Sequence, residues 1–343
     1  MSKSLETVML KNISFKNSIV RSATFSRIGN QDGSISDSEM IMYKELARNN
    51  IGLIITGHCY VSSTGRMSYN QTSISDDSYI PRLKELVTMV KQFDCKIVAQ
   101  ISHAGAQTSV VDEPIAPSNI EMIQGHHARK LSLLEIEQIK QDFIHAAFRA
   151  KESGFDGVQV HVAHNYLLCQ FVTPAFNHRT DSYGGSQKGR FRIVKEIIEG
   201  IKEKCGREYP VFVKINSNVE SDEVQYFNDL VAMLKEFKIL GVEAVEVSGY
   251  NFFRKGINEH NYYLDTVRAL REQVDIPVIV VGGVRNFNDM DEMLNAGINM
   301  ISLSRPLICE PDLITKLMEG QKESKCLSCN KCFSVQDKRC VLH

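Results

Sequence analysis

The chain has 343 residues, 43% of them hydrophobic, which is enough apolar material for one large domain or two ordinary ones. The 40 Lys and Arg residues nearly balance the 41 Asp and Glu residues, so a net charge of -1 gives no basic field for nucleic acid or an anionic membrane. No signal-like N-terminal segment or apolar run of membrane-spanning length stands out. We therefore expect a globular cytoplasmic protein that binds neither nucleic acid nor membrane.

Eight short runs rich in β-branched residues recur along the chain, separated by segments with helical periodicity. The runs cover residues 18–24, 52–58, 96–102, 157–162, 211–216, 242–248, 277–283 and 299–304. They are almost continuously apolar, as in parallel sheets that are buried on both faces. The count of eight favours a (β/α)8 TIM barrel of the α/β class, and a doubly wound open sheet is the alternative.

Sequence signals for helix starts and ends support the alternation of strands and helices. Residues 36–49 and 132–154 each begin with Ser followed three residues later by Glu, a pattern that caps helix starts. Gly154, Gly241 and Gly297 stand where three of the helices should end. By contrast, residues 103–131 lack a clear period and are predicted to form an extended loop.

No repeat or linker divides the chain. We expect a single barrel domain over residues 1–320, followed by a Cys-rich tail over residues 321–343. Four of the nine cysteines lie in this tail, within the sequence CLSCNKCFSVQDKRC. In a large cytoplasmic protein these thiols are expected to be reduced rather than paired as disulfides.

Polar side chains gather at the predicted strand ends, where barrel active sites form. They are His58, Gln100, His103, His161, His164, Lys214, Ser248 and Arg305. After the seventh strand, Gly282 and Gly283 allow backbone amides to approach an anion at a helix start, and Arg305 could complete a phosphate site. Alternatively, the glycines only turn the chain and Arg305 is a surface cation.

Several separated motifs carry a resemblance that covers residues 12 to about 318. The longest is HVAHNYLLCQFVTPAFNHRTDSYGGSQKGRFR, and NSIVRSAT, QISHAGAQ, VVGGV and LSRPLICEPD support it. Together they resemble the old yellow enzyme family, which comprises FMN-dependent NAD(P)H oxidoreductases. The resemblance implies FMN as cofactor, NADH or NADPH as reductant, and a small-molecule electron acceptor such as an enone or enoate.

The resemblance also implies a role for each matching residue. The cofactor-binding residues would be Ser22, Ala23 and Thr24 along the flavin, Gln100 at its pyrimidine edge, Lys214 near its N1 and O2 atoms, and Gly282, Gly283, Ser304 and Arg305 at the phosphate. His161 and His164 would bind the acceptor's oxygen, and Tyr166 would donate a proton.

Physical chemistry supports the roles of the histidines and the tyrosine. When a hydride reaches the β-carbon of an enone, negative charge grows on the carbonyl oxygen, and two imidazole N–H groups stabilise that charge. The α-carbon then needs a proton, which a tyrosine can supply. An isolated histidine at a strand end is more often a packing residue, and we expect this of His58 and His103.

Several positions depart from the family pattern, and Lys214 is one of them, because much of the family has arginine there. Phe25 stands where many relatives have Thr or Cys, and Ala106 with Gln107 replaces an arginine after the HAG motif. The acceptor range of relatives therefore does not transfer to this chain. Arg179 and Asp181 are expected to organise a loop.

The tail resembles, incompletely, the iron–sulfur segment of relatives typified by 2,4-dienoyl-CoA reductase. Cys326, Cys329, Cys332 and Cys340 give the spacing C-x2-C-x2-C-x7-C, whereas those relatives have C-x3-C and C-x11-C in the last two intervals. The four thiols could bind a [4Fe–4S] cluster or zinc, or remain reduced without a metal.

Two further hypotheses remain open. One is a metal-dependent barrel hydrolase with His58, His103, His161 and His164 as ligands, although no carboxylates cluster beside them. The other is a flavin-binding redox sensor that uses the tail cysteines. A homo-oligomer is compatible with either hypothesis and with the oxidoreductase.

Overall fold

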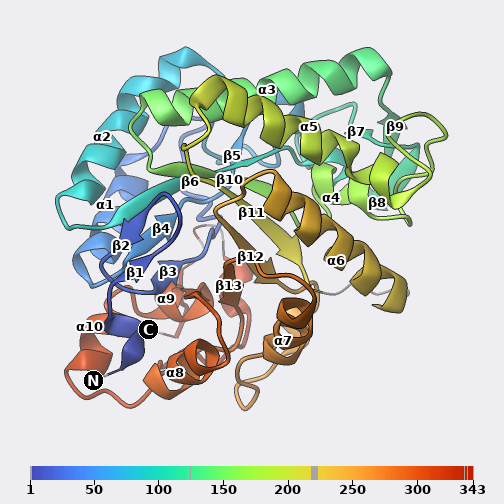
Figure 1. Ribbon diagram of the computed structural model, residues 1–343. Coiled ribbons are helices and arrows are strands. Elements are labelled where there is room, and N and C mark those ends of the chain that lie inside the picture. The colour runs from blue at the N-terminus through green and yellow to red at the C-terminus, as the bar shows by residue number, and fades with distance from the viewer. Residues whose placement is uncertain (1, 124, 218–222, 336, 338, 343) are drawn as a thin grey trace.

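The computed structural model describes residues 2–123, 125–217, 223–335, 337 and 339–342. In these ranges, eight parallel strands form a closed barrel surrounded by helices (Figure 1). The strands are β3 (Ile19–Arg21), β4 (Leu53–Ile55), β6 (Lys96–Ser102), β10 (Gly157–Val162), β11 (Val211–Asn216), β12 (Ala244–Ser248), β13 (Val278–Val281) and β14 (Met300–Leu303). Pairing between β6 and β10 closes the sheet, so the barrel prediction is confirmed and the open-sheet alternative is wrong.

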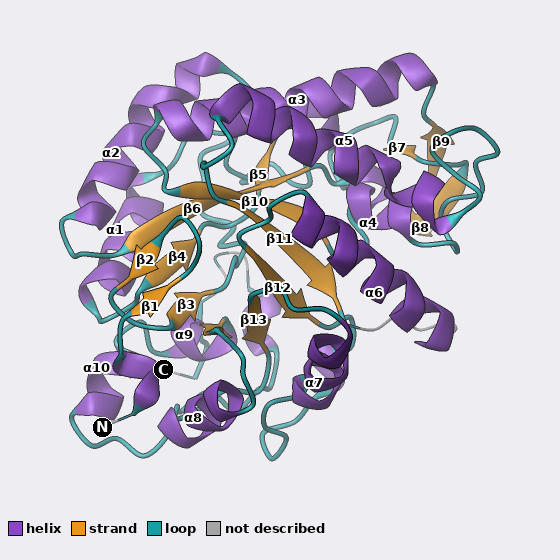
Figure 2. Ribbon diagram, viewed as in Figure 1, coloured by secondary structure: helices purple, strands orange, loops and turns teal. Residues whose placement is uncertain are grey.

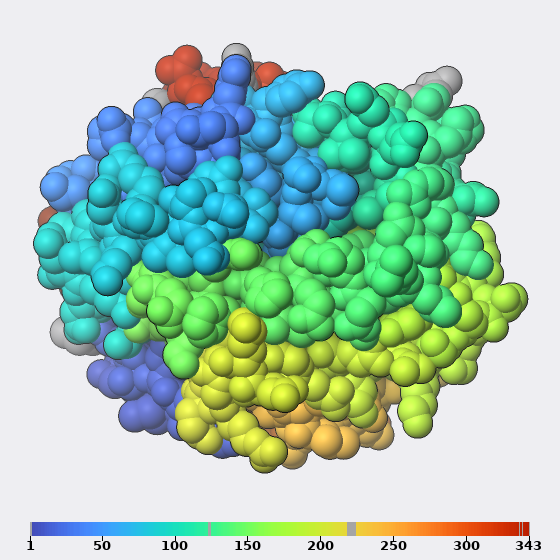
Figure 3. Space-filling view, turned by 90° about the horizontal axis from the view of Figure 1, so that it is seen from above, coloured from blue at the N-terminus to red at the C-terminus, as the bar shows by residue number. Residues whose placement is uncertain are grey.

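The helices lie outside the strands, as the two ribbon colours of Figure 2 show. They are α1 (Asp37–Arg48), α2 (Ile80–Lys91), α3 (Leu133–Glu152), α4 (Leu167–Val172), α5 (Gln187–Cys205), α6 (Glu223–Ile239), α7 (Leu264–Gln273), α8 (Phe287–Asn295), α9 (Arg305–Cys309) and α10 (Leu313–Met318). In Figure 3 the cyan, green and yellow bands of α2, α3 and α5 lie side by side. Helices that follow one another in the chain are therefore neighbours in space, as successive βα units require.

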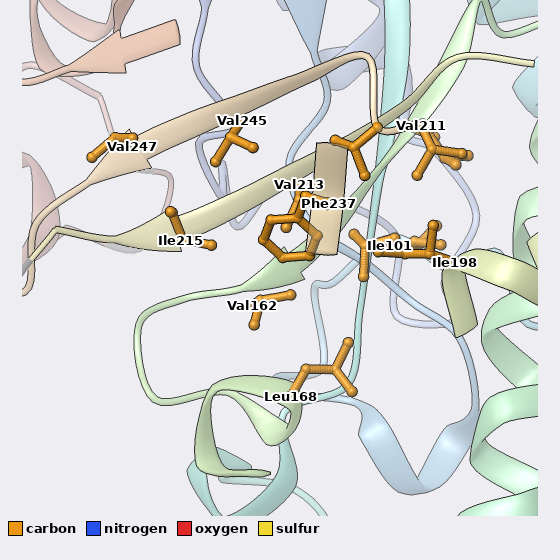
Figure 4. Close-up of a cluster of buried hydrophobic side chains, with 14 of the residues drawn as sticks. Ile101, Val162, Leu168, Ile198, Val211, Val213, Ile215, Phe237, Val245 and Val247 are labelled. Carbon is orange, nitrogen blue, oxygen red and sulfur yellow. The ribbon is translucent and has the colours of Figure 1, made fainter. Parts of the chain in front are cut away.

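Most of the hydrophobic core fills the layer between strands and helices. Figure 4 shows Val213 of β11 and Val245 of β12 in the same buried cluster as Phe237 of α6 and Ile198 of α5. Side chains alternate between the two faces of a strand, so these residues point outward from the barrel and their neighbours in sequence point inward.

A second, smaller apolar cluster fills one end of the barrel interior. It contains Val20, Leu53, Ile55, Val98, Phe212, Ala244, Ile279 and Met300 from the strands. The hairpin of β1 (Val8–Met9) and β2 (Ser14–Phe15) adds Leu10, Ile13 and Phe15 to the same cluster. The hairpin therefore closes the amino-terminal end of the barrel, and the carboxyl-terminal end is left for a site.

Caps explain where the helices begin and end. Ser132 and Glu135 form the predicted reciprocal capping box at α3. Ser36 also caps α1, but Glu39 turns inward and is buried against Ser26 and Thr72 instead of completing a box. Gly154, Gly241 and Gly297 have φ angles of +87°, +69° and +85°, the left-handed conformation that ends a helix.

One expectation about the fold is wrong. Residues 103–131 are not an extended loop, because they form a short 3-10 helix and a small three-stranded sheet. Its strands are β7 (Ile115–Ala116), β8 (Ile120–Ile123) and β9 (His126–Lys130). The buried Arg179 donates to the carbonyl oxygens of Pro117 and Leu131 and pairs with Asp181, so it ties this sheet to the loop after α4. The expectation that Arg179 and Asp181 organise a loop is therefore confirmed.

None of the helices in the described ranges combines the length and the apolar character that a bilayer crossing would need. The division into a barrel over residues 1–320 and a tail over residues 321–343 stays a prediction.

Candidate active site

A cavity of about 1260 Å³, including its open mouth, lies at the carboxyl ends of the barrel strands. Its lining contains all twelve predicted cofactor and catalytic residues: Ser22, Ala23, Thr24, Gln100, His161, His164, Tyr166, Lys214, Gly282, Gly283, Ser304 and Arg305. These residues come from six of the eight strands or from the segments that follow them. The groups expected to bind a phosphate and those expected to bind an acceptor thus share one cavity.

The acceptor end is built after β10. His161 points inward from the strand, and the chain then turns through His164 and Asn165, which have φ angles of +56° and +60°. This turn brings Tyr166 back toward His161, with 5.0 Å between the two ring centroids. His164 lies 5.3 Å from His161, and its Nε2 is 3.0 Å from the hydroxyl of Ser248. Three groups that can hold or donate a proton therefore surround one point of the cavity.

His161 has a nitrogen without a protein partner. Its Nδ1 atom is buried and makes no hydrogen bond to any of the described residues. Burial, followed by the charges of His164, His58 and Lys214, holds the pKa of His161 well below its ordinary value. A neutral imidazole nitrogen of this kind can accept a partner from a ligand or from solvent in the cavity.

His58 also belongs to the site, contrary to the sequence-based expectation of a packing residue. It lines the cavity, and its Nε2 lies 3.2 Å from the hydroxyl of Tyr166. The sequence held a signal for this placement, because His58 follows β4 at the carboxyl end of the barrel, where Gln100 and His161 also lie near the ends of β6 and β10.

His103 lies outside the cavity lining and agrees with its expected packing role. Its Nδ1 accepts from the amide of Gly105, and its Nε2 lies 3.3 Å from the hydroxyl of Thr64. Burial lowers the pKa of His103 to about 3, so the ring is neutral at ordinary pH.

The floor of the cavity is a buried polar network that sequence reasoning missed. Glu246 accepts hydrogen bonds from Ser22, Ser302 and Gln159, each at 2.7 or 2.8 Å. Its carboxylate also lies 3.3 Å from the ammonium group of Lys214.

Burial alone would raise the pKa of Glu246, but Lys214 and the three hydrogen bonds outweigh it and hold that pKa below its ordinary value. The ionised carboxylate therefore fixes Lys214. Through Gln159, which accepts from the amide of Gln100 at 2.7 Å, it also fixes Gln100.

The opposite end of the cavity is cationic. Arg305 lines it beside Ser304, whose hydroxyl lies 2.9 Å from that of Thr24. Arg285, which sequence reasoning missed, also lines the cavity and has a buried Nε without a hydrogen-bond partner among the described residues. Two guanidinium groups at one end suit the phosphate of a mononucleotide.

Part of the tail covers this cationic end. Arg305 donates to the side chain of Asn330 at 2.7 Å and to the carbonyl oxygen of Ser328 at 3.4 Å. Ser328 and Phe333 both line the cavity, and the Phe333 ring packs 5.7 Å from that of Phe252. The tail thus forms one wall of the site.

The tail cysteines gather but do not form a metal site in this structure. Cys326, Cys329, Cys332 and Cys340 line one small pocket, together with Cys309 of α9. However, within the described ranges no three His, Cys, Asp or Glu side chains are placed to hold one metal ion. The iron–sulfur and zinc assignments therefore stay predictions, and the geometry of the four histidines does not support a metal-dependent hydrolase.

The residues present fit FMN. A cationic end with two guanidinium groups, one of which has an Nε without a hydrogen bond among the described residues, suits the phosphate. Gln100 and Lys214 provide fixed polar groups at the floor for the ring. The Nδ1 atom of His161, which has no partner among the described residues, is available to bind the electron acceptor above that floor. A closed parallel barrel with this set of groups at its carboxyl end defines a flavin-dependent oxidoreductase.

Sequence comparison agrees. Residues 6–324 match the NADH:flavin oxidoreductase / NADH oxidase family, so the chain belongs to this family and the resemblance to old yellow enzymes is confirmed. The predictions of FMN as cofactor and NADH or NADPH as reductant are confirmed at the level of the family.

Two relatives illustrate the range of sizes. The chain is 33% identical to an NADH oxidase of Thermoanaerobacter brockii over 337 residues, which is 93% of this chain and 51% of that protein. It is 31% identical to an NADPH dehydrogenase of Bacillus subtilis (strain 168) over 308 residues, which is 89% of this chain and 90% of that protein. The chain thus spans about half the length of the first relative and most of the second.

Solved structures share the fold. Morphinone reductase in complex with tetrahydroNAD superposes with a TM-score of 0.80 at 23% identity, covering 93% of this chain and 91% of that one. A complex of 2-naphthoyl-CoA reductase with 2-naphthoyl-CoA superposes with a TM-score of 0.87 at 22% identity, covering 96% of this chain and 54% of that one.

Proposed function

We propose that the protein uses NADH or NADPH to reduce electron-poor alkenes, such as enones and enoates, through FMN. The observation that carries the proposal is the shared cavity. Its lining contains His161, with its orphaned nitrogen, and Tyr166, together with Arg285 and Arg305, which we expect to bind the phosphate. The names of two relatives, NADPH dehydrogenase and NADH oxidase, support NADH or NADPH as the reductant. Morphinone reductase and 2-naphthoyl-CoA reductase are named for reducing small organic molecules.

Bound in the cavity, reduced FMN would supply a hydride for the β-carbon of the acceptor. Lys214 would lie near the pyrimidine side of the ring, where its charge favours the anionic reduced form. Gln100 would orient that side by hydrogen bonding, because Gln159 and Glu246 hold its amide in place.

His161 and His164 would bind the acceptor's carbonyl oxygen. Their rings lie 5.3 Å apart, which allows N–H groups of both to reach one oxygen. Because negative charge develops on that oxygen as the β-carbon is reduced, such donors stabilise the transition state more than the ground state.

Tyr166 would then protonate the α-carbon. Burial raises the pKa of Tyr166 above its ordinary value, so the hydroxyl keeps its proton at neutral pH until the carbanionic carbon forms beside it. The proton moves from the hydroxyl oxygen to carbon, and water later restores it to the tyrosine.

Replacing the hydroxyl tests this role. We expect Tyr166→Phe to slow reoxidation of the reduced enzyme by 2-cyclohexenone about 100-fold, in line with the usual contribution of a general acid. The loss should fall on this oxidative half-reaction rather than on flavin reduction by NADPH or NADH. Stopped-flow absorbance of the flavin measures both half-reactions separately.

Tyr209→Phe is a matched control, because Tyr209 is half-buried like Tyr166 but lies outside the cavity lining, where its hydroxyl lies 3.4 Å from the carbonyl oxygen of Phe155. It should leave both half-reactions as in the unsubstituted protein. Equal losses in the two half-reactions of Tyr166→Phe would show that this residue is not the proton donor.

A further inference from the structure

His58 connects the proposed proton donor to a buried amide. Its Nε2 lies 3.2 Å from the Tyr166 hydroxyl, and its Nδ1 lies 2.6 Å from the Nε2 atom of Gln71. Gln71 is fully buried and His58 is 8% exposed, so bulk water does not compete strongly for either contact.

The surroundings of Gln71 fix the orientation of its amide. The Oε1 atom accepts from the backbone N–H of Met67 at 2.6 Å, and the Nε2 atom donates to the backbone carbonyl of His58 at 3.0 Å. A backbone N–H only donates and a carbonyl only accepts, so the amide cannot be reversed without losing both bonds. The nitrogen of Gln71 therefore faces the imidazole.

The amide in turn fixes the proton on His58. Facing an N–H donor, Nδ1 must be the unprotonated nitrogen, which places the proton of the neutral ring on Nε2. Turning the His58 ring over would put carbon atoms where Nδ1 and Nε2 lie, and the hydrogen bonds to Gln71 and Tyr166 would both be lost. A doubly protonated ring would set two donors against each other at 2.6 Å.

We propose that His58, oriented by Gln71, is a positioning residue that donates its Nε2–H to the Tyr166 oxygen and so directs the tyrosine's own proton toward the acceptor. A phenol that accepts a hydrogen bond on one side can direct its own O–H elsewhere, and Tyr166 lines the cavity in which the acceptor would bind. The edge-on packing of Tyr166 against His58 and His161, with centroids 5.1 and 5.0 Å away, restricts the phenol ring.

This inference rests on the proposed function, because it concerns the protonation of the acceptor's α-carbon. In that step the O–H bond of Tyr166 breaks and the electron pair on the α-carbon takes the proton to form a C–H bond. The phenolate that remains keeps the hydrogen bond from His58, which stabilises its charge until water returns a proton. The hydride and its two electrons come from NAD(P)H by way of the flavin, so the step needs no further reactant.

The test compares His58→Phe, which keeps a ring but has no donor, with His58→Gln, which keeps an N–H group. The measured quantity is the rate of reoxidation of the reduced holoenzyme by 2-cyclohexenone. We expect His58→Phe to lower this rate about 10-fold, the value of one lost hydrogen bond, and His58→Gln to recover most of it. In a Tyr166→Phe background, His58→Phe should change the rate by less than about twofold, because the group it orients is gone.

Two outcomes overturn the inference. One is a His58→Phe enzyme as fast as the unsubstituted enzyme, and the other is the same loss in both backgrounds, which would show that His58 does not act through Tyr166. If Tyr166→Phe alone leaves reoxidation unchanged, the proposed function fails instead, so the two failures are distinguishable.

A measurement on the unsubstituted holoenzyme does not depend on how the variants fold. Nitrogen NMR of labelled histidine, with the His58 signals assigned from their absence in His58→Gln, should show a neutral ring protonated on Nε2 at neutral pH. A ring protonated on Nδ1, or on both nitrogens, would contradict the proposed direction of the hydrogen bond.

Discussion

At the scale of single residues, burial decides how the histidines of this protein behave. His103 is packed among described residues and kept neutral, with its pKa lowered to about 3. His161 is kept neutral in the same way but has an unpartnered nitrogen in a cavity. The same physical effect therefore stabilises the fold at one position and prepares a ligand-binding group at the other.

Acid should destabilise the protein partly through His103. A histidine whose pKa is lower in the folded than in the unfolded state stabilises the fold above the unfolded pKa, and this stability is lost as the pH falls from about 6.5 toward 3. We expect the His103 contribution to the free energy of unfolding to fall by about 2 kcal/mol between pH 7 and pH 5.

Urea unfolding at the two pH values measures this change. His103→Asn, which keeps an oxygen to accept from the amide of Gly105, should lose about 2 kcal/mol less than the unsubstituted protein on acidification. Equal losses in the two proteins would show that His103 does not contribute to acid sensitivity.

Sequence reasoning found the site residues that carry a local pattern. His161, His164 and Tyr166 are close together in the chain, and the glycines and Arg305 follow strands, so their positions could be predicted. Glu246 and Gln159 could not be found in this way, since each looks like an ordinary strand residue until the barrel closes. The role of His58 depends on Gln71, which no spacing in the sequence connects to Tyr166.

At the scale of elements, two neighbouring strands change character along their inward faces. On β11, Phe212 packs in the apolar cluster and Lys214 lines the cavity. On β12, Ala244 packs in the same cluster and Glu246 is buried beside Lys214. The apolar side chains therefore pack beneath the buried polar side chains, and the polar side chains lie at the floor of the cavity. Strand existence was predictable from β-branched runs, whereas several observed strands are shorter than predicted because their ends leave the sheet to line the cavity.

Breaking the pair of Glu246 and Lys214 should be costly. Both side chains are almost fully buried, so Glu246→Gln leaves an ammonium group without a counter-charge and should lower the free energy of unfolding by about 3 kcal/mol. Adding Lys214→Met removes the unpaired charge and should restore much of that loss. Urea unfolding of the two variants and the unsubstituted protein measures the effect.

The double variant distinguishes charge from packing. Purely additive losses would mean that Glu246 contributes through packing and hydrogen bonds alone, and not by balancing Lys214.

Residues 103–131 show the limit of prediction at this scale. Their strands are short, and β8 and β9 pair with an irregular register, so no alternating pattern extends over enough residues to be recognised. The sheet also depends on Arg179, which is about 50 residues further along the chain. A tertiary contact of this kind leaves little trace in local periodicity.

At the scale of the whole molecule, closure of the barrel brings groups from both ends of the chain into one cavity. Ser22 and Thr24 follow the first barrel strand, whereas Ser304 and Arg305 follow the last, and β14 pairs with β3 to join them. The tail then covers the cationic end of that cavity through Asn330 and Phe333. The groups proposed to bind the cofactor and the acceptor therefore come together only in the closed barrel and not in any single segment.

The most direct measurement is an anaerobic titration of the purified protein with NADPH and with NADH, followed by addition of 2-cyclohexenone. We expect at least one nucleotide to bleach the visible absorbance of bound FMN and the enone to restore it as the alkene is reduced. A flavin that neither nucleotide bleaches, or a reduced flavin that neither the enone nor an enoate reoxidises, would contradict this expectation.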